Sequence, residues 1–290
     1  MIEFFKKLFL PITAPITFIQ NNFKTFVFLA IVALIVSSSD ETNMTPHNLQ
    51  KISLVGPIFD ATKIVEEIDE AAKDLHVKGI LLSVNSPGGA VSPSIEIAEA
   101  IRRANEKKPV VVYAAGTLAS GSYYASIYAT QIVANPGSMV GSIGVIMQGA
   151  DVEELMHKVG VSSQVVTAGK YKQVGTIERK WRDYEVAELN KVIDGTYKMF
   201  VADVANARGL DINSSDTFAN AHIFTAHQAK EVGLVDDLGV EFDAKTTLVK
   251  LSGVSEPTWN KEDKFDKILK NLGASGSAML HTYFPTLTLK

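Results

Sequence analysis

Three short apolar runs separated by amphipathic stretches constrain the fold of this 290-residue chain more than any other feature. The runs are KISLVGPI from Lys51, GILLSV from Gly79 and PVVVYAAG from Pro109. Between them, residues 60–76 and 93–106 repeat apolar side chains at helical spacing. Strands that are almost wholly apolar belong to parallel sheets whose faces are covered by helices. The pattern therefore predicts an α/β fold with a helix-covered sheet.

The same periodicities extend through the rest of the chain. Short strands are expected at 131–137 and 142–147, and a helix should begin at Ser120. Residues 152–160 and 183–208 have the apolar spacing of helices. We find no internal sequence repeat and no low-complexity tract.

The N-terminal region resembles a membrane anchor. Residues Thr25 to Val36 are uncharged and almost wholly apolar, and with their flanks a span of Ile16 to Ser38 is long enough to cross a bilayer. Three lysines precede the run and two acidic residues follow it, so the N-terminal side is expected in the cytoplasm and the remainder outside. A signal peptide cleaved near Ser37 to Ser39 and a buried core helix are the alternatives.

This gives a simple partition of the chain. Residues 1–39 are the N-terminal cytoplasmic segment and transmembrane anchor, and the polar stretch 40–48 is a linker. One domain is expected at 49–250. The tail, 251–290, contains an expected amphipathic helix at 261–272.

Composition excludes several kinds of site. The chain has no cysteine, so it can form no disulfide, thiolate zinc site or cysteine nucleophile. Its net charge is −4 at pH 7 and no run of Lys and Arg forms a phosphate-binding surface, which argues against nucleic acid as a partner. We expect no metal ion and no cofactor.

Two segments could carry chemistry. The turn Asn85-Ser86-Pro87-Gly88-Gly89 follows a buried strand, and its glycines allow a sharp turn and a close approach to a ligand. Ser120 stands between a strand and a helix, where it would be exposed at the positive end of the helix dipole. The N–H groups of the glycines and of Gly121 could stabilise an oxyanion. An ordinary turn and a simple helix N-cap at Ser120 are the alternatives.

A serine nucleophile needs a base that removes its proton. None of the six histidines follows a strand in a setting that suits a catalytic triad. Lysine can act as the base when burial lowers its pKa, and Ser–Lys pairs are a variant of the triad. The residues alone do not choose among the lysines of this chain.

Four motifs in order, SVNSPGGAV, LASGSYYAS, PGSMVGSIGVI and AGKYKQ, resemble the short single-copy form of the bacterial signal peptide peptidase A family. The resemblance runs from about Lys51 to Gly239. It implies a Clp-protease/crotonase-like core of repeated β-β-α units, here preceded by the N-terminal transmembrane helix. It also implies a serine peptidase with a lysine base.

The family's site residues carry over position by position. The resemblance implies that Ser120 is the nucleophile and Lys172 the general base. It further implies that Ser142 hydrogen-bonds the lysine and orients its amine. Gly89, with Gly88 beside it, matches the oxyanion loop of the family.

The sequence departs from the family in the same region. Gln173 follows the lysine where Asp or Ser is more common, VGTIERKW replaces the usual Gly-Ser-Pro, and Ala226 replaces a glycine. Lys170 remains a competing base, because residues two apart share one face of an extended segment.

The resemblance implies an endopeptidase that degrades signal-peptide remnants or other membrane-derived or unfolded peptides. It would be a single-pass protein of the bacterial inner membrane with its catalytic domain on the periplasmic side. Short members of the family form rings in which one subunit's serine meets a neighbour's lysine, so we expect a homo-oligomer with active sites at subunit interfaces. A crotonase-type acyl-CoA enzyme and a non-catalytic membrane scaffold are the alternatives.

Overall fold

The computed structural model describes residues 21–29 and 47–260. Residues 21–29 are mostly helical, and the second range belongs to one compact unit, Pro46–Asn260. Most of the expected span at 16–38, and the tail helix expected at 261–272, lie outside the described residues. Within the two described ranges, no helix is both long and apolar enough to cross a membrane.

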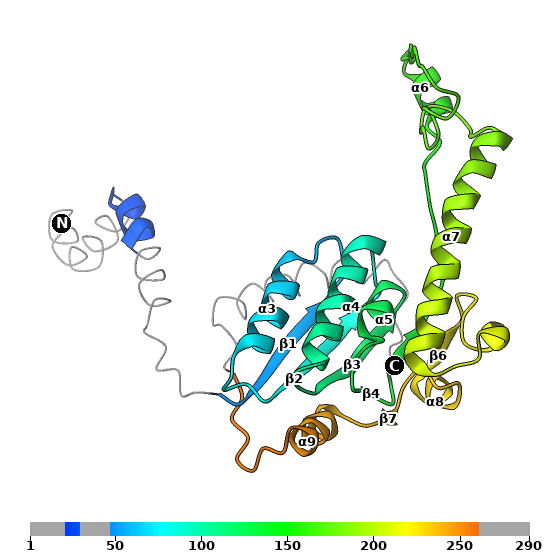
Figure 1. The fold of residues 1–290 in the computed structure, drawn as a ribbon. Helices are drawn as coiled ribbons and strands as arrows, with labels where there is room; N and C mark the ends of the chain where they lie inside the picture. Colours follow the sequence, from blue (N-terminus) through cyan, green and yellow to red (C-terminus); the bar gives the residue numbers. More distant parts are fainter. Residues whose placement is uncertain (1–20, 30–46, 261–290) are drawn as a thin grey trace, which may run out of the picture. The chain divides into compact units, whose positions relative to one another are not determined.

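A seven-stranded sheet forms the centre of the compact unit (Figure 1). Its main strands run parallel in the order β1-β2-β3-β4-β7. β5 pairs parallel with the end of β3, and β6 pairs antiparallel with β5. The strands are β1 (Leu49–Val55), β2 (Gly79–Ser86), β3 (Val110–Ala119), β4 (Gln131–Ala134), β5 (Met139–Gly141), β6 (Ile223–Thr225) and β7 (Asp237–Leu238).

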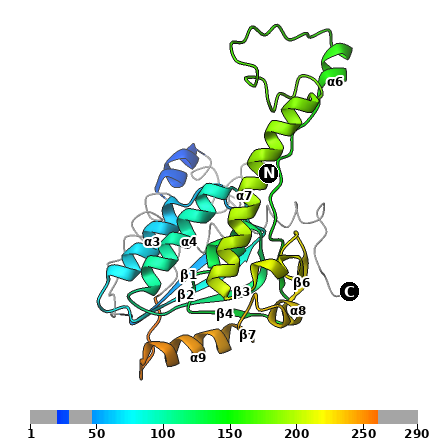
Figure 2. The same ribbon diagram turned by 45° about the vertical axis from the view of Figure 1, so that its right-hand side comes forward.

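Helices cover both faces of the sheet, as the two views in Figures 1 and 2 show. Three helices pack on one face and the fourth packs on the other, against β2 and β3. The first three are α3 (Thr62–Lys73), α4 (Val91–Asn105) and α5 (Gly121–Ser126), and the fourth is α9 (Glu241–Ser252). The predicted α/β fold is therefore confirmed.

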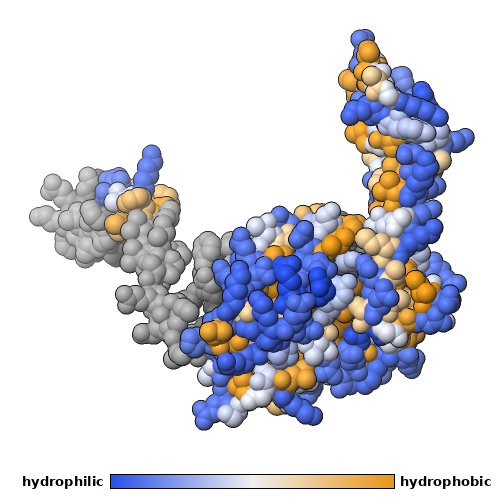
Figure 3. Space-filling view, in the orientation of Figure 1, coloured by the Kyte–Doolittle hydropathy of each residue, from blue (hydrophilic) through white to orange (hydrophobic). Residues whose placement is uncertain are grey.

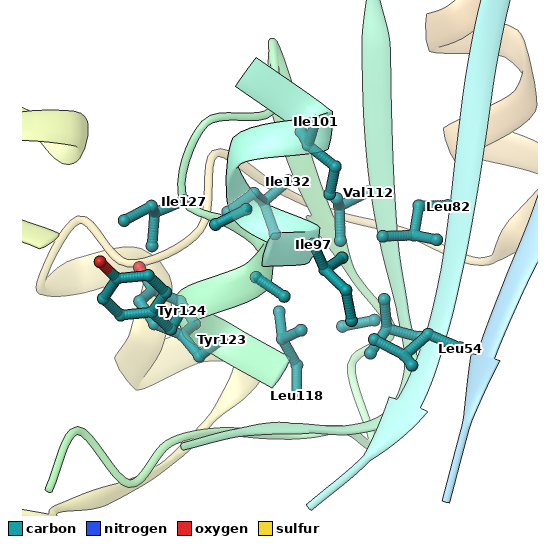
Figure 4. Close-up of a cluster of buried hydrophobic side chains, with 14 of the residues drawn as sticks. Leu54, Leu82, Ile97, Ile101, Val112, Leu118, Tyr123, Tyr124, Ile127 and Ile132 are labelled. Atoms are coloured by element: carbon teal, nitrogen blue, oxygen red, sulfur yellow. The ribbon is translucent and has the colours of Figure 1, made fainter. Parts of the chain in front are cut away.

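The apolar runs are explained by burial on both faces, because alternate side chains of a strand point to opposite sides. In β2, Ile80, Leu82 and Val84 enter the larger core beneath α3 and α4, whereas Leu81 enters the smaller core beneath α9. Figure 4 shows the larger core, where Leu82 lies among side chains from neighbouring strands and from α4. A polar side chain on either face would therefore be desolvated without a partner.

After β5 the chain leaves the sheet and forms an arm, residues 142–182. The short helix α6 (Glu153–Lys158) lies in this arm, and the long helix α7 (Asp183–Arg208) leads back to the sheet (Figures 1 and 2). The buried apolar residues of α7 all lie in its C-terminal part, from Phe200 onward. The N-terminal half of α7 and the arm therefore project from the sheet.

The structure confirms two of the helices expected in this region and corrects one strand. The helices predicted at 152–160 and 183–208 correspond to α6 and α7. The strand predicted at 142–147 is wrong, because the strand here is β5, which ends at Gly141. Gly141 and Ser142 have φ values of 109° and 50°, and this pair of positive φ angles turns the chain out of the sheet.

Apolar side chains are exposed along the arm (Figure 3). Ile146 is 85% exposed, and Leu155, Val166 and Ile177 are also exposed. Exposed apolar patches of this kind mark interaction surfaces.

The compact unit extends to Asn260, past the boundary expected at residue 250. The Leu49 N–H donates to the Thr258 carbonyl at 3.0 Å, and Asn260 Nδ2 donates to the Lys51 carbonyl at 3.0 Å. These bonds pair the outer edge of β1, whose backbone groups would otherwise be open to other chains. Two further helices, η1 (Ile212–Thr217) and α8 (Ala226–Glu231), lie between α7 and β7.

Candidate active site

Ser120 lies in a strained turn between β3 and α5. Its φ and ψ are 53° and −124°, in a region that non-glycine residues rarely adopt. Its N–H donates to the Gly141 carbonyl at 2.8 Å, but its hydroxyl makes no capping bond to α5. Capping therefore does not account for this serine, and such strain persists only where the surroundings enforce it.

Two buried serines that sequence reasoning missed hold this turn. The fully buried Ser122 Oγ accepts a hydrogen bond from the Ala119 N–H at 2.9 Å and lies 2.7 Å from the Ser86 carbonyl oxygen. Ser86 Oγ in turn accepts from the Gly88 N–H at 3.2 Å. The turn that carries Ser120 and the glycine turn at 85–89 are therefore joined by hydroxyl groups. The signal in the sequence was a serine beside each motif, but serine is common in turns.

Gly89 and Gly121 present two N–H groups that have no acceptor among the described residues. Ile58 forms a parallel bridge with Gly89 by bonding the groups on either side of it, the Gly88 carbonyl at 2.8 Å and the Ala90 N–H at 2.7 Å. This bridge leaves the Gly89 N–H directed away from Ile58. Gly121 is the first residue of α5, where an N–H has no partner within the helix. The pair can receive an oxyanion.

The close approach of the two turns requires glycine at Gly88. Its φ is +88°, and a Cβ at this position would lie 2.4 Å from the Gly121 nitrogen. A Cβ on Gly121 would itself lie 3.2 Å from the Gly89 nitrogen and 2.3 Å from Ser94 Oγ. Side chains here would fill the space where the N–H groups converge.

A cavity of about 310 Å³ brings four of the predicted site residues together: Ser120, Ser142, Gly89 and Gly121. No charged residue lines it in the described part of the chain. Most of the wall is apolar and comes from the glycine turn, the start of α4, α5, the arm and α7: Pro87, Val91, Tyr124, Val145, Ile146, Met199 and Phe200. The cavity therefore suits an apolar side chain beside a nucleophile.

Ser142 is held in the wall of this cavity by the corner that precedes β6. Its φ is 50°, and its N–H donates to the His222 carbonyl at 2.7 Å. The Ala221 N–H donates to the Ile143 carbonyl at 2.9 Å. Both bonds fix the backbone that carries the Ser142 hydroxyl.

Lys172 is exposed on the arm and does not line the cavity. In the described ranges its ammonium makes no hydrogen bond, ion pair or ring contact. The other candidate base, Lys170, lies over the rings of Tyr171 and Tyr184 at 5.3 and 5.0 Å. This cation–π arrangement occupies Lys170 but leaves Lys172 available.

The segment that carries Lys170 and Lys172 is anchored at the N-terminal end of α7, whereas the α7 residues that line the cavity begin at the middle of the helix, with Thr196, Met199 and Phe200. At the anchor, Arg179 forms two bonds of 2.8 Å with the buried Glu185 carboxylate. These bonds, together with the Arg182 N–H, lower the pKa of Glu185 to about 2. With a rise of 1.5 Å per residue, Tyr184 and Phe200 are about 24 Å apart along α7. Figures 1 and 2 both show α6 at the end of α7 that is distant from α5. Within one chain, Lys172 and Ser120 are not brought together.

Comparisons with known proteins identify the family. The sequence model of peptidase family S49 matches residues 102–255, just over half of the chain. The Clp protease model matches residues 47–138, in agreement with a Clp-protease-like α/β fold.

Several relatives are named as proteases or candidate proteases. A candidate protease of Methanocaldococcus jannaschii is 44% identical over 68% of this chain and 64% of its own length. One of Synechocystis is 36% identical over 72% of this chain and 76% of its own. A candidate signal peptide peptidase SppA of Enterococcus faecium is 33% identical over 69% of this chain and 58% of its own. The match thus covers under two thirds of the first and third of these relatives. The resemblance inferred from the four motifs is confirmed, and the chain belongs to the serine peptidases of family S49.

Proposed function

We propose that this protein is a membrane-anchored serine endopeptidase in which Ser120 attacks the carbonyl of a peptide bond. The observation that carries the proposal is the pair of N–H groups without acceptors, from Gly89 and Gly121, beside a strained serine in an apolar cavity. The two donors would stabilise the oxyanion of the tetrahedral intermediate.

Lys172 would serve as the base, supplied by a second copy of the chain. Its ammonium has no partner among the described residues, and its segment is anchored far from its own Ser120 along α7. The exposed apolar residues of the arm support coverage by another copy. Ser142, in the cavity wall, would hydrogen-bond the incoming amine and orient it. The Lys172 amine would take the proton from the Ser120 hydroxyl and then give it to the amine that leaves from the cleaved peptide bond.

The substrates would be signal-peptide remnants or other membrane-derived or unfolded peptides. An uncharged, largely apolar cavity supports an apolar residue next to the cleaved bond. The apolar run at 25–36 supports a single-pass anchor in the inner membrane, with the compact unit on the periplasmic side. The acyl-CoA alternative lacks support, because no acidic group among the described residues lines the cavity.

A mixing experiment with the detergent-solubilised full chain tests the mechanism. Ser120→Ala and Lys172→Ala should each abolish peptide cleavage, and Lys170→Ala should retain most of it. If the pair forms between copies, subunits of the two inactive variants mixed after dissociation should recover about a quarter of the sites in a ring. If the mixed ring recovers no cleavage activity, the intermolecular pair is refuted.

A serine-reactive fluorophosphonate probe tests the nucleophile separately. It should label wild-type protein at Ser120 and leave Ser120→Ala unlabelled. Failure to label wild-type protein would instead favour the non-catalytic scaffold.

A further inference from the structure

The C-terminal part of α7 presents one face to the site. Tyr197, Phe200 and Asp203 are spaced three apart and lie on the same side of the helix. Phe200 lines the cavity, and the other two residues form hydrogen bonds on either side of it. These bonds connect α7 to two different parts of the site.

The first bond connects α7 to the nucleophile helix. Tyr124 on α5 donates its hydroxyl to Asp203 Oδ2 at 2.5 Å, and its ring meets Phe200 edge-on at 5.1 Å. The Tyr124 N–H donates to the Ser120 carbonyl at 3.0 Å, so the same residue belongs to the turn of the nucleophile. Burial, and then the bond to Asp203, raise the pKa of Tyr124, which keeps its hydroxyl a donor.

The second bond connects α7 to the corner that holds Ser142. The Asn220 N–H donates to the Tyr197 hydroxyl oxygen at 2.9 Å. Asn220 and Ala221 have φ values of 56° and 57°, so this corner is strained and needs external support. The corner is also the segment that bonds the backbone on both sides of Ser142. Tyr197 therefore acts on Ser142 through two backbone hydrogen bonds.

We propose that Tyr124 and Tyr197 are positioning residues that fasten α7 to the nucleophile turn and to the Ser142 corner. This inference rests on the proposed peptidase function. The N-terminal end of the same helix holds the lysine arm through Tyr184 and Glu185. Helix α7 thus connects the serine site of a subunit to the arm whose lysine that subunit would supply to a neighbouring copy.

Three phenylalanine variants of the full chain test the proposal. Tyr124→Phe and Tyr197→Phe each remove one hydroxyl, and Tyr128→Phe is the matched control. The Tyr128 hydroxyl has no hydrogen-bond partner in the described part of the chain. Fluorophosphonate titration counts the competent serines, and peptide cleavage per titrated site then gives kcat and KM.

Tyr124→Phe should keep the titre near that of wild type and lower kcat per site about tenfold, the effect of about 1.4 kcal/mol. Tyr197→Phe should move the acid limb of the pH–rate profile to higher pH, because a displaced Ser142 no longer favours the neutral amine. Tyr128→Phe should match wild type in both measurements. Wild-type rates per site and wild-type pH profiles in both variants would overturn the proposal, as would a loss explained by fewer titrated sites alone.

A second measurement does not depend on peptidase activity. Hydrogen exchange at the Ser142 amide should be faster in Tyr197→Phe than in wild type or Tyr128→Phe. Unchanged exchange would count against the positioning role even if the enzyme is active. Absent cleavage and labelling in wild type, with faster exchange in the variant, would reject the peptidase and retain the mechanical link.

Discussion

Ser122→Ala should loosen the turn that carries Ser120, the proposed nucleophile. The Ser122 hydroxyl is fully buried and accepts from the Ala119 N–H at 2.9 Å. It lies within donor distance of two carbonyl oxygens, Ser86 at 2.7 Å and Ala119 at 2.9 Å. Its single proton can serve only one of them at a time. Removing the hydroxyl leaves the Ala119 N–H without its acceptor and one of the two carbonyl oxygens without its donor, in a region that water does not reach.

The magnitude follows from these lost partners. A buried polar group without a partner costs about 1–3 kcal/mol, and each net hydrogen bond contributes about 1 kcal/mol. We therefore expect Ser122→Ala to lower the free energy of unfolding by about 2–3 kcal/mol. Because the turn includes Ser120 and its strained backbone, fluorophosphonate labelling should also slow.

Ser126→Ala is the matched control on the same helix. Ser126 is also fully buried, but its hydroxyl only donates to the Ser122 carbonyl at 2.8 Å, four residues earlier. Such a back-bond within a helix contributes little, so the loss should be below about 1 kcal/mol. Urea unfolding of the two full-length variants measures both values. Equal stability losses, together with unchanged labelling in Ser122→Ala, would refute the role assigned to Ser122.

Three further outcomes are expected. The ion pair of Glu185, whose pKa is lowered to about 2, should stabilise the arm fully above the ordinary carboxyl pKa of 4.5 and lose this effect as the pH falls toward 2. Glu185→Gln should therefore show a smaller rise in proteolysis of the arm between pH 5 and pH 3 than wild type. Lys108 donates to three carbonyls at 2.7–2.8 Å, so Lys108→Met should destabilise the fold by about 2 kcal/mol in urea unfolding. Gly88→Ala should abolish labelling, because the new Cβ would lie 2.4 Å from a backbone nitrogen. Gly253→Ala, also at positive φ but with no atom within 4 Å, should label normally.

Local pattern in the sequence is sufficient for most of the secondary structure. The β2 run is apolar on both faces because each face packs against its own helix layer. The continuous apolar pattern therefore predicts a strand that is buried on both sides. The 183–208 periodicity predicts α7 with its observed bounds. The strand expected at 142–147 fails because only Ile143 of its apolar residues enters the core, whereas Val145 and Ile146 line the cavity and Met147 is exposed. Periodicity cannot distinguish this setting from a sheet.

For the candidate site, too, some features follow from the sequence and others only from the tertiary structure. The sequence by itself determines the glycine turn at 88–89, the serine at a strand–helix junction and the membership in a peptidase family. Only the tertiary structure decides that Ser120 and Ser142 face one cavity and that Ser122 joins two turns separated by 36 residues of sequence. It also decides that the arm holds Lys172 away from the cavity that contains Ser120 of the same chain. The reason is physical: backbone conformation follows from neighbours in the chain, whereas hydroxyl partners and the distance between two functional groups depend on contacts between remote segments.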